Sequence, residues 1–407
     1  MKLSIEKILS LYIALTPVFW FWVIPTGVMI PLKLGLLVFI IFYYTILKKT
    51  KIKKKYLYFL VFFTLTVIPS IIRTTISGWL YKYFFFLLII LTVGAFYNFF
   101  KSKTIDEIIR FLKFPSLFVA GICLITISNY LFGVPDWREA AANEAYPVYL
   151  YQTGFSATRT SWTPAISLFF ISNLYFFFHE KKTKYKVLFL LAAVAILMSQ
   201  IFSGGRTGLL ISVVAIMYYI FIKVNAKILI ITFLATLFII IPQFEVIIKT
   251  ARLEHIDFTS FKTLNEFSTG RLIQMVWGID KFFQEYNFLI GAGFDLEDSV
   301  YLSKKYGEVE IHNFWINMAV RGGILMLLFY LLFALYYILK SISVYRKEKK
   351  AEIFMLIIIC GLTGTLIEPA LILGKVQTTI VWWIAVAAID VIGTRQFNAE
   401  IEKRNEL

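Results

Sequence analysis

The sequence has few charged residues, three histidines and two cysteines. Asp, Glu, Lys and Arg together make up only 16% of its 407 residues. So small a charged fraction is far below that of soluble globular proteins. Together with unbroken apolar runs, it excludes a disordered chain, a secreted disulfide scaffold and a soluble enzyme. The sequence also lacks P-loop, GxGxxG, HExxH and CxxC motifs, so we expect no cofactor and no metal site.

What the sequence has instead is apolar residues in long runs. Hydrophobic residues make up 59% of the chain and aromatic residues 18%. A helix needs about 20 residues to cross a bilayer core about 30 Å thick. Apolar runs near that length predict an all-α polytopic membrane protein with about twelve transmembrane helices. The runs lie near 8–24, 28–47, 56–72, 79–100, 114–133, 161–178, 187–203, 207–222, 227–243, 313–339, 353–373 and 376–393.

The net charge of +16 comes from 41 Lys and Arg against 25 Asp and Glu. Basic residues near helix ends remain on the cytoplasmic side of a membrane. If the N-terminus is cytoplasmic, 26 of the 41 basic residues fall in inner segments. We therefore place both termini in the cytoplasm and the long segments 134–160 and 244–312 outside. Topology then accounts for the charge, and nucleic acid is not needed as a partner.

This topology divides the chain into three parts. Residues 1–243 form nine helices with short loops, 244–312 form a large extracytoplasmic loop with short helices, and 313–407 form the last three helices and a cytoplasmic tail. Within the large loop, the sequence FSTGRLIQMVWGIDKFF predicts an amphipathic helix with Ser268 or Thr269 as its N-cap. The GAGF sequence that follows predicts a turn.

A few basic residues lie at the outer ends of helices, where the charge bias is unfavourable. Arg206 is the clearest, because it interrupts QIFSGGRTGLLISVV between two apolar runs. The glycines around it permit a tight turn and close approach of a ligand. Thr207 is a possible cap of the next helix, whose N-terminal amides would then face an anion. The alternative is an arginine that only reaches toward the membrane surface from a turn.

Arg271 and His312 lie at either end of the second half of the large loop. Arg271 is expected at the start of the amphipathic helix, and two arginines that face one pocket suit a pyrophosphate group. His312 stands in VEIHNFWINMAVRGGILML, directly before the tenth apolar run. A neutral imidazole there can accept a proton from a hydroxyl group near neutral pH. The alternatives are a surface arginine and an interfacial histidine bonded to a carbonyl group.

Three further residues are weaker candidates. Arg159 lies in FSATRTSWTP, just before the sixth helix, and belongs to the same group of outer cations. Arg321, followed by two glycines, is either another cation of the outer pocket or a structural partner of Glu368. Glu368 itself is a candidate for a buried carboxylate, which we expect to pair with Lys82, Arg321 or Lys375 rather than to take part in catalysis.

Four motifs occur in order around the large loop. They are SGGRTGLL at 203–210, TGRLIQMVWGI at 269–279, GAGF at 291–294 and HNFWINMAVRGGI at 312–324. Together they resemble the family of O-antigen polymerases (Wzy) and O-antigen ligases. The resemblance implies a GT-C-like, metal-independent glycosyltransferase without a cofactor, whose donor is an undecaprenyl-pyrophosphate-linked glycan. It also implies a bacterial inner-membrane protein whose active site faces the periplasm or the exterior.

The resemblance also implies roles for individual residues. Arg206 and Arg271 would bind the pyrophosphate, and His312 would be the general base or would orient the acceptor. Arg159 would contact the substrate. The partners implied are the lipid-linked donor, a glycan or lipid acceptor, membrane lipid and a chain-length regulator.

Three activities fit these residues. A polymerase, which we favour, would use a second lipid-linked repeat unit as its acceptor. An O-antigen ligase would transfer the glycan to lipid A-core instead. A flippase or other transporter of lipid-linked oligosaccharide would instead show inverted repeats and ionisable residues near the middle of the membrane.

Overall fold

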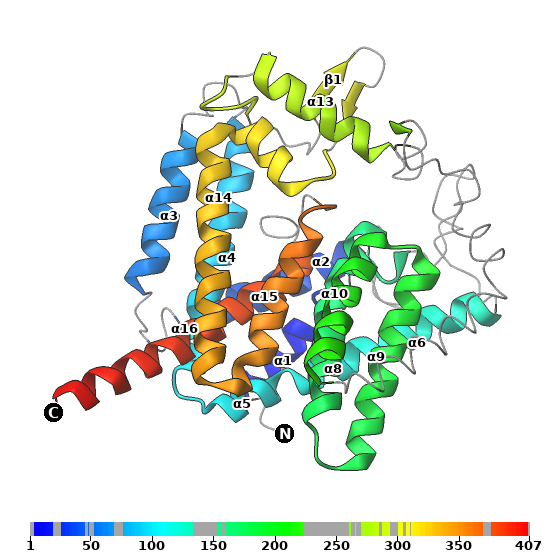
Figure 1. Ribbon diagram of the computed structural model, residues 1–407, viewed down its shortest axis with the longest axis vertical. Helices are drawn as coiled ribbons and strands as arrows, with labels where there is room; N and C mark the ends of the chain where they lie inside the picture. The colour runs from blue at the N-terminus through cyan, green and yellow to red at the C-terminus, as the bar shows by residue number, and fades with distance from the viewer. Residues whose placement is uncertain are drawn as a thin grey trace.

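The described part of the chain folds almost entirely into helices (Figure 1). A computed structural model describes residues 4–18, 26–44, 48, 53–68, 76–132, 153–156, 159–223, 260–261, 265, 270–284, 287–293, 300–303, 307–309, 311–368 and 376–405. Six of the described helices are long and apolar enough to cross a membrane. The predicted fold class, an all-α multi-pass membrane protein, is confirmed at this level.

The bounds of the elements follow the chain from the N-terminus. They are α1 (Ile5–Leu15), α2 (Thr26–Phe42), α3 (Lys54–Val67), α4 (Ile76–Phe100), α5 (Ile105–Phe111), α6 (Lys113–Phe132), α8 (Arg159–His179), α9 (Thr183–Ser203), α10 (Arg206–Lys223), α13 (Arg271–Gln284), β1 (Val300–Ser303), β2 (Gly307–Val309), α14 (Phe314–Lys347), the 3-10 turn η3 (Lys349–Ala351), α15 (Glu352–Gly364) and α16 (Val376–Asn405).

Every predicted apolar run except the ninth contains one of these helices. The ninth run, 227–243, lies outside the described residues. Two helices extend past the predicted runs, because α14 continues to Lys347 and α16 continues to Asn405, through most of the predicted tail. The amphipathic helix of the large loop is present as α13, and the antiparallel pair β1–β2 beside it was not predicted. The number of twelve spans and the GT-C arrangement stay predictions.

Helix α8 is the central helix of the described bundle. All its residues from 161 to 176 are buried, and it packs against α6, α9, α10, α15 and α16. Glycines just before and within the first turn of α10 let this helix approach α8 closely, since a Cβ atom at Gly205 or Gly208 would overlap Thr163 of α8. Close approach over small residues is the usual way in which transmembrane helices associate.

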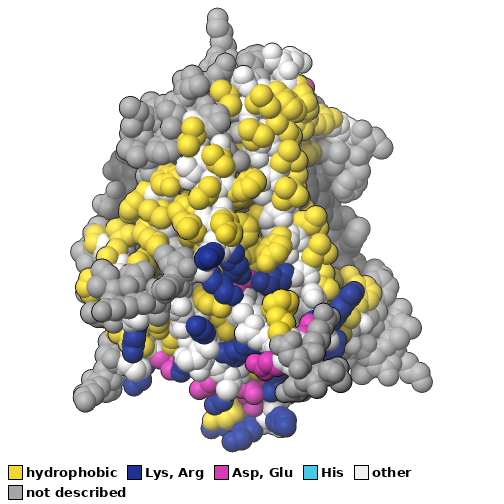
Figure 2. Space-filling view, turned by 90° about the vertical axis from the view of Figure 1, so that its left-hand side faces the viewer, with side chains coloured by type: hydrophobic (Ala, Val, Ile, Leu, Met, Phe, Trp, Pro, Cys, Tyr) yellow, Lys and Arg dark blue, Asp and Glu magenta, His cyan; other side chains and the backbone are white. Residues whose placement is uncertain are grey.

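Ion pairs join several lysine-rich segments at one end of the molecule. These pairs are Lys350–Asp106 (2.8 Å), Lys113–Glu180 (2.7 Å) and Lys340–Asp390 (2.5 Å). We call this end, formed by residues 101–113, 180–186 and 340–352, the basic end. Figure 2 shows apolar side chains over the upper part of one face and most of the charged side chains below them. Helix α13 and strand β1 lie at the opposite end (Figure 1).

Candidate functional site

Arg271 is the first residue of α13, at the end of the molecule opposite the basic end. The preceding Gly270 has φ of 82°, a conformation that favours glycine and turns the chain into the helix. The side-chain oxygen of Asn265 accepts a hydrogen bond of 2.9 Å from the backbone N–H of Ile273, so it caps one of the first helical amides. The two predicted caps, Ser268 and Thr269, lie outside the described residues.

Helix α14 breaks at Gly323, where φ is 72° and ψ is −175°. In a straight helix, the carbonyl groups of Val320 and Arg321 would accept hydrogen bonds from residues four positions later. Here they accept them from Ala292 (2.7 Å) and Gly293 (2.9 Å) instead. The chain turns at 287–291, where Gly291 donates to the carbonyl oxygen of Asn287 at 2.7 Å, just before the position predicted for the GAGF turn, and Phe294 lies outside the described residues. Ala292 and Gly293 supply the hydrogen bonds that the break in α14 removes.

The contact between the segment at 288–293 and the break in α14 requires glycine at two positions of the motifs. Beyond the break, Ile324 donates its backbone N–H to the carbonyl oxygen of Phe288 at 2.9 Å. A Cβ atom at Gly323 would overlap the carbonyl group of Leu289, and one at Gly291 would overlap Val320. These glycines therefore allow two backbone segments to touch, which joins the motif at 291–294 to the motif at 312–324.

The start of α14 is hydrogen-bonded to the turn that follows α15. Asn313 is the N-cap of α14, and its side-chain oxygen accepts a hydrogen bond from Ile316 at 3.0 Å. The amide nitrogen of the same side chain donates to the carbonyl oxygen of Leu366 at 3.0 Å. The backbone N–H of Phe314 donates to Thr365 at 2.9 Å. These bonds fix the residue before the cap, His312, against the end of α15.

His312, Glu368 and Arg271 come together at this junction. Nδ1 of His312 lies 3.9 Å from Oε2 of Glu368, and Nη1 of Arg271 donates to the carbonyl oxygen of Ile367 at 3.4 Å. A distance of 3.9 Å exceeds a hydrogen bond, so the two side chains would form an ion pair only when the imidazole is protonated. Residues far apart in sequence therefore form one group, which we call the Arg271–His312–Glu368 cluster.

The pKa of His312 is lowered to about 4 by burial of the imidazole and, second, by the positive charge of Arg271. Both effects disfavour the protonated ring, because a buried site solvates charge poorly and a neighbouring cation repels a second one. His312 is therefore neutral at physiological pH. Its side chain keeps 22% of its surface exposed, so a ligand can still reach the ring.

Glu368 is buried beside His312, a neighbour that the sequence analysis did not consider. Among the partners that we expected, Lys375 and the side chain of Lys82 lie outside the described residues. Arg321 is buried inside α14, only 2% exposed, directly before the two glycines of the break. Both of these charged side chains thus lie in the protein interior.

Arg206 is the first residue of α10, and its side chain is exposed. Two expectations about its surroundings were wrong. Thr207 does not cap the helix, because the helix begins one residue earlier and Thr207 is buried in its first turn. The glycines at 205 and 208 contact Thr163 of α8 rather than leaving room for a ligand. Gly204 has φ of 65° and ends α9, as expected for a tight turn.

A buried polar network lies beneath Arg206. The side chain of Gln200 in α9 donates to Ser167 of α8 at 3.0 Å and accepts from Ser212 of α10 at 2.9 Å. Ser167 also donates to the carbonyl oxygen of Gly208 at 3.1 Å. These hydrogen bonds fix the relative positions of α8, α9 and α10 more closely than apolar contacts alone would. They therefore also fix the position of Arg206 at the start of α10.

Arg206 lies at the same end of the molecule as the Arg271–His312–Glu368 cluster. Helices α10 and α15 pack against each other in opposite directions, because the last turns of α10 contact the first residue of α15. These contacts join Tyr218 (2.9 Å) and Lys223 (3.9 Å) to Glu352. The start of α10 therefore lies beside the far end of α15, which leads to Glu368.

Arg159 is the first residue of α8, and its side chain lies outside the described residues. Its helix begins next to α10, since Thr163 contacts the glycines beside Arg206. The structure thus places the predicted site residues in two groups, both at the end of the molecule opposite the basic end. Arg271 and His312 meet Glu368, whereas Arg159 and Arg206 begin two neighbouring helices.

No group of three His, Cys, Asp or Glu side chains within the described part of the chain could hold a metal ion. The side chains that meet at the candidate site carry a guanidinium, an imidazole and a carboxyl group. No protein-family model matches the sequence, and a search of curated proteins returns no relative.

Proposed function

We propose that this protein is a metal-independent membrane glycosyltransferase that polymerises undecaprenyl-pyrophosphate-linked repeat units at the outer face of the bacterial inner membrane. One observation carries the proposal. Arg271 and His312, which the motifs select, lie together at the end of the molecule opposite the lysine-rich segments. The motif resemblance supplies the reaction, and the proximity of a permanent cation to a neutral base supports it.

Arg271 is the proposed ligand of the donor pyrophosphate. A guanidinium group stays charged at any relevant pH and makes paired hydrogen bonds with phosphate oxygens. Arg206 is the proposed second ligand, because it is exposed and begins a helix at the same end of the molecule. Two arginines would stabilise the charge that builds up on the leaving pyrophosphate, a task that a metal ion performs in many other enzymes.

His312 is the proposed general base. The acceptor hydroxyl oxygen attacks the anomeric carbon of the donor, and its proton passes to the imidazole. The bond between that carbon and the phosphate oxygen breaks, and its electron pair leaves with undecaprenyl pyrophosphate. Attack from the side opposite the leaving group inverts the anomeric centre. The imidazolium that forms would be stabilised by the carboxylate of Glu368, 3.9 Å away.

Donor binding would also activate the base. In the free protein, the charge of Arg271 is one of the two causes that lower the pKa of His312 to about 4. A pyrophosphate bound to Arg271 would offset that charge and add negative charge beside the ring, so the pKa of His312 would rise. A weak base in the free protein would become a stronger one when the donor is bound.

The experiment supplies purified protein with a lipid-linked repeat unit, in the presence of EDTA, and follows the length of the lipid-linked products. We expect a ladder of longer chains, which His312→Gln abolishes and His255→Gln, a change of another histidine in the loop, does not. A second reaction adds lipid A-core as the acceptor. Transfer to lipid A-core without chain growth would establish the ligase, and translocation without new glycosidic bonds would establish a transporter.

A further inference from the structure

Three lysine side chains gather around one carboxylate where α3, α14 and α16 meet. Lys55 and Lys340 both form ion pairs with Asp390 of α16, and Nζ of Lys340 lies 2.5 Å from Oδ1 of that carboxylate. One turn further along α16, the hydroxyl of Thr394 accepts a hydrogen bond of 2.7 Å from Nζ of Lys53. We call Lys53, Lys55 and Lys340 the lysine cluster.

The positive charge of the lysine cluster is only partly balanced. Within the described residues, Asp390 is the one carboxylate that pairs with these lysines. The charges of Lys53 and Lys340 both repel that of Lys55. Three ammonium groups against one carboxylate leave a local excess of positive charge, which a bound anion would stabilise.

The lysines are accessible, whereas the carboxylate is not. The side chains of Lys55 and Lys340 keep 23% and 21% of their surface exposed, and Asp390 is fully buried. Its carboxylate is also engaged by Tyr56 and Tyr337, which donate hydrogen bonds to it at 2.7 Å and 3.1 Å. An anion can therefore approach the ammonium groups without meeting an exposed carboxylate.

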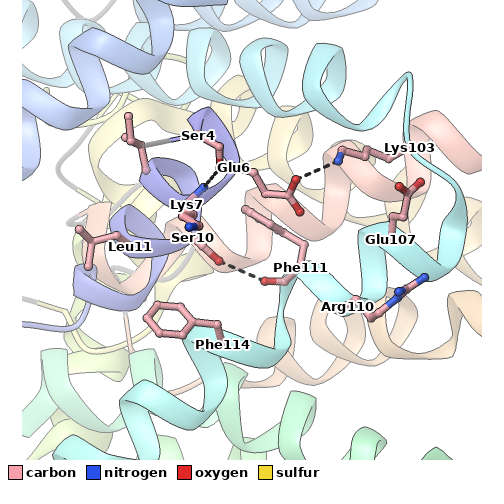
Figure 3. Close-up of a pocket in the computed structure, with 11 residues that line it drawn as sticks. Ser4, Glu6, Lys7, Ser10, Leu11, Lys103, Glu107, Arg110, Phe111 and Phe114 are labelled. Carbon is pink, nitrogen blue, oxygen red and sulfur yellow. Dashed lines mark hydrogen bonds and ion pairs between the residues drawn. The ribbon is translucent and has the colours of Figure 1, made fainter. Parts of the chain in front are cut away.

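The cavity of about 830 Å³ between α1, α5 and the start of α6 differs in this respect (Figure 3). Two acidic residues, Glu6 and Glu107, line it together with basic ones. Glu6 pairs with Lys103 at 2.9 Å, yet its side chain keeps 47% of its surface exposed. An anion in this cavity would meet accessible negative charge, so the lysine cluster is the better site for one.

The two helices that carry the cluster continue away from it as neighbours. Phe59, one turn after Lys55 on α3, packs against Phe333, about two turns before Lys340 on α14, with ring centroids 4.9 Å apart. The helices are therefore antiparallel. Their contact extends from the lysines toward the opposite end of the molecule (Figure 1).

Exposed apolar side chains lie along this contact. Tyr336, whose ring centroid is 6.3 Å from that of Phe59, is 44% exposed, and Phe62 and Leu332, further from the lysines, are 59% and 63% exposed. Figure 2 shows lysine and arginine side chains gathered directly below the apolar surface of one face. Lysines directly beside apolar surface near the end of a membrane helix lie at the depth of lipid headgroups.

We propose that the lysine cluster binds the headgroup of one anionic phospholipid from the leaflet at the basic end. The lipid phosphate would contact Lys55 and Lys340, and an acyl chain would pack along Tyr336, Phe62 and Leu332. Free phosphate would use only the lysines and leave the apolar surface uncovered. A phospholipid matches both parts, and this inference does not depend on the proposed glycosyl transfer.

The test measures lipid binding by the full chain. The detergent-purified protein is titrated with phosphatidylglycerol or phosphatidylcholine, and bound lipid is counted by native mass spectrometry. The double variant Lys53→Gln/Lys340→Gln removes two lysines of the cluster and leaves Lys55 paired with Asp390. We expect it to bind phosphatidylglycerol about 25-fold more weakly, since each lysine near a membrane surface contributes roughly a factor of five.

The matched control is Lys181→Gln/Lys184→Gln, which removes two exposed lysines from the basic end and should leave the affinity unchanged. Three results would overturn the proposal. They are an unchanged affinity in the cluster variant, an equal loss in the control variant, and release of the lipid by millimolar inorganic phosphate, which would mean that only the anion is recognised.

A measurement on the unmodified chain keeps the test decisive if the cluster variant misfolds. Photoreactive phosphatidylglycerol should form adducts with residues 55–62 or 332–340, and photoreactive phosphatidylcholine should label them far less. Adducts found only elsewhere, or equal labelling by the two lipids, would contradict the site.

Discussion

Nδ1 of His312 lies 3.9 Å from a carboxylate oxygen of Glu368, across the junction between the start of α14 and the end of α15. The hydrogen bonds of Asn313 and Phe314 to the turn at 365–366 hold this distance. At this distance a negatively charged Glu368 makes no hydrogen bond to the imidazole, but it would stabilise the protonated ring electrostatically. In the proposed mechanism, Glu368 would therefore act through His312 rather than on the substrate.

Replacing Glu368 should slow glycosyl transfer without preventing donor binding. We expect Glu368→Gln to lower the rate of chain growth by about tenfold and His312→Gln by about 10² to 10⁴, the usual contribution of a general base. The measurement is single-turnover chain growth with saturating donor, combined with donor affinity from a binding titration. The control is Glu402→Gln on the exposed tail helix. Full activity of Glu368→Gln would remove the carboxylate from the mechanism.

The titration of His312 should depend on Arg271. Two charged groups face the imidazole, the guanidinium of Arg271 and the carboxylate of Glu368. Because burial and Arg271 lower the pKa of His312 to about 4, the ring should stay neutral as the pH falls from 8 to 5 and gain its proton only below that. Removal of the cation in Arg271→Gln should move this pKa upward, toward 6.5.

The measurement is an NMR titration of the protein labelled at its three histidines. The signal of His312 is identified by its loss in His312→Gln. Arg346→Gln, which removes an exposed arginine at the basic end, serves as the control and should leave the titration unchanged. A His312 signal that titrates near 6.5 in the unmodified protein would contradict a net lowering of its pKa by burial and Arg271.

The sequence was sufficient to predict most of the helices. Long apolar runs fold into helices because a lipid environment offers the backbone no other partner for its hydrogen bonds. The amphipathic pattern at 267–283 likewise predicted α13. In the candidate site, the motifs selected Arg271 and His312, which the fold brings together.

Contacts between distant segments were not predictable in this way. Glycines at 205 and 208 suggested room for a ligand, but a sequence does not show that Thr163 fills that space. Glu368 suggested an ion pair, but its neighbour His312 depends on how α14 meets α15. Asp390 went unnoticed as a single carboxylate in an apolar run, because its partners come from α3 and α14.

The break in α14 should tolerate no side chain at Gly323. Gly323→Ala would place a methyl group against the carbonyl of Leu289 and force a φ of 72° on alanine. We expect a loss of about 1–3 kcal/mol in stability, seen as a lower midpoint of thermal unfolding in detergent. Gly121→Ala is the matched control, since its Cβ would meet no atom within 4 Å and the helix propensity of alanine is higher. Equal midpoints for the two variants would contradict the role of the break.

The ion cluster at Asp390 should make a larger contribution to stability than any surface pair. Asp390 is fully buried, accepts hydrogen bonds from Tyr56 (2.7 Å) and Tyr337 (3.1 Å), and pairs with Lys55 and Lys340. Asp390→Asn would leave two lysine charges without a counter-charge among helices α3, α14 and α16.

Removing one partner of a buried ion pair costs about 3–5 kcal/mol, because the remaining charge stays poorly solvated. We therefore expect Asp390→Asn to unfold in detergent at a much lower temperature than the unmodified protein. Glu400→Gln is the control, since Glu400 pairs with Lys347 on the surface, where both side chains are about half exposed, and its loss should change stability by less than about 1 kcal/mol. If Lys55→Met and Lys340→Met introduced together restore the stability of Asp390→Asn, the loss comes from the uncompensated charges; if they do not, the carboxylate acts through its tyrosine hydrogen bonds.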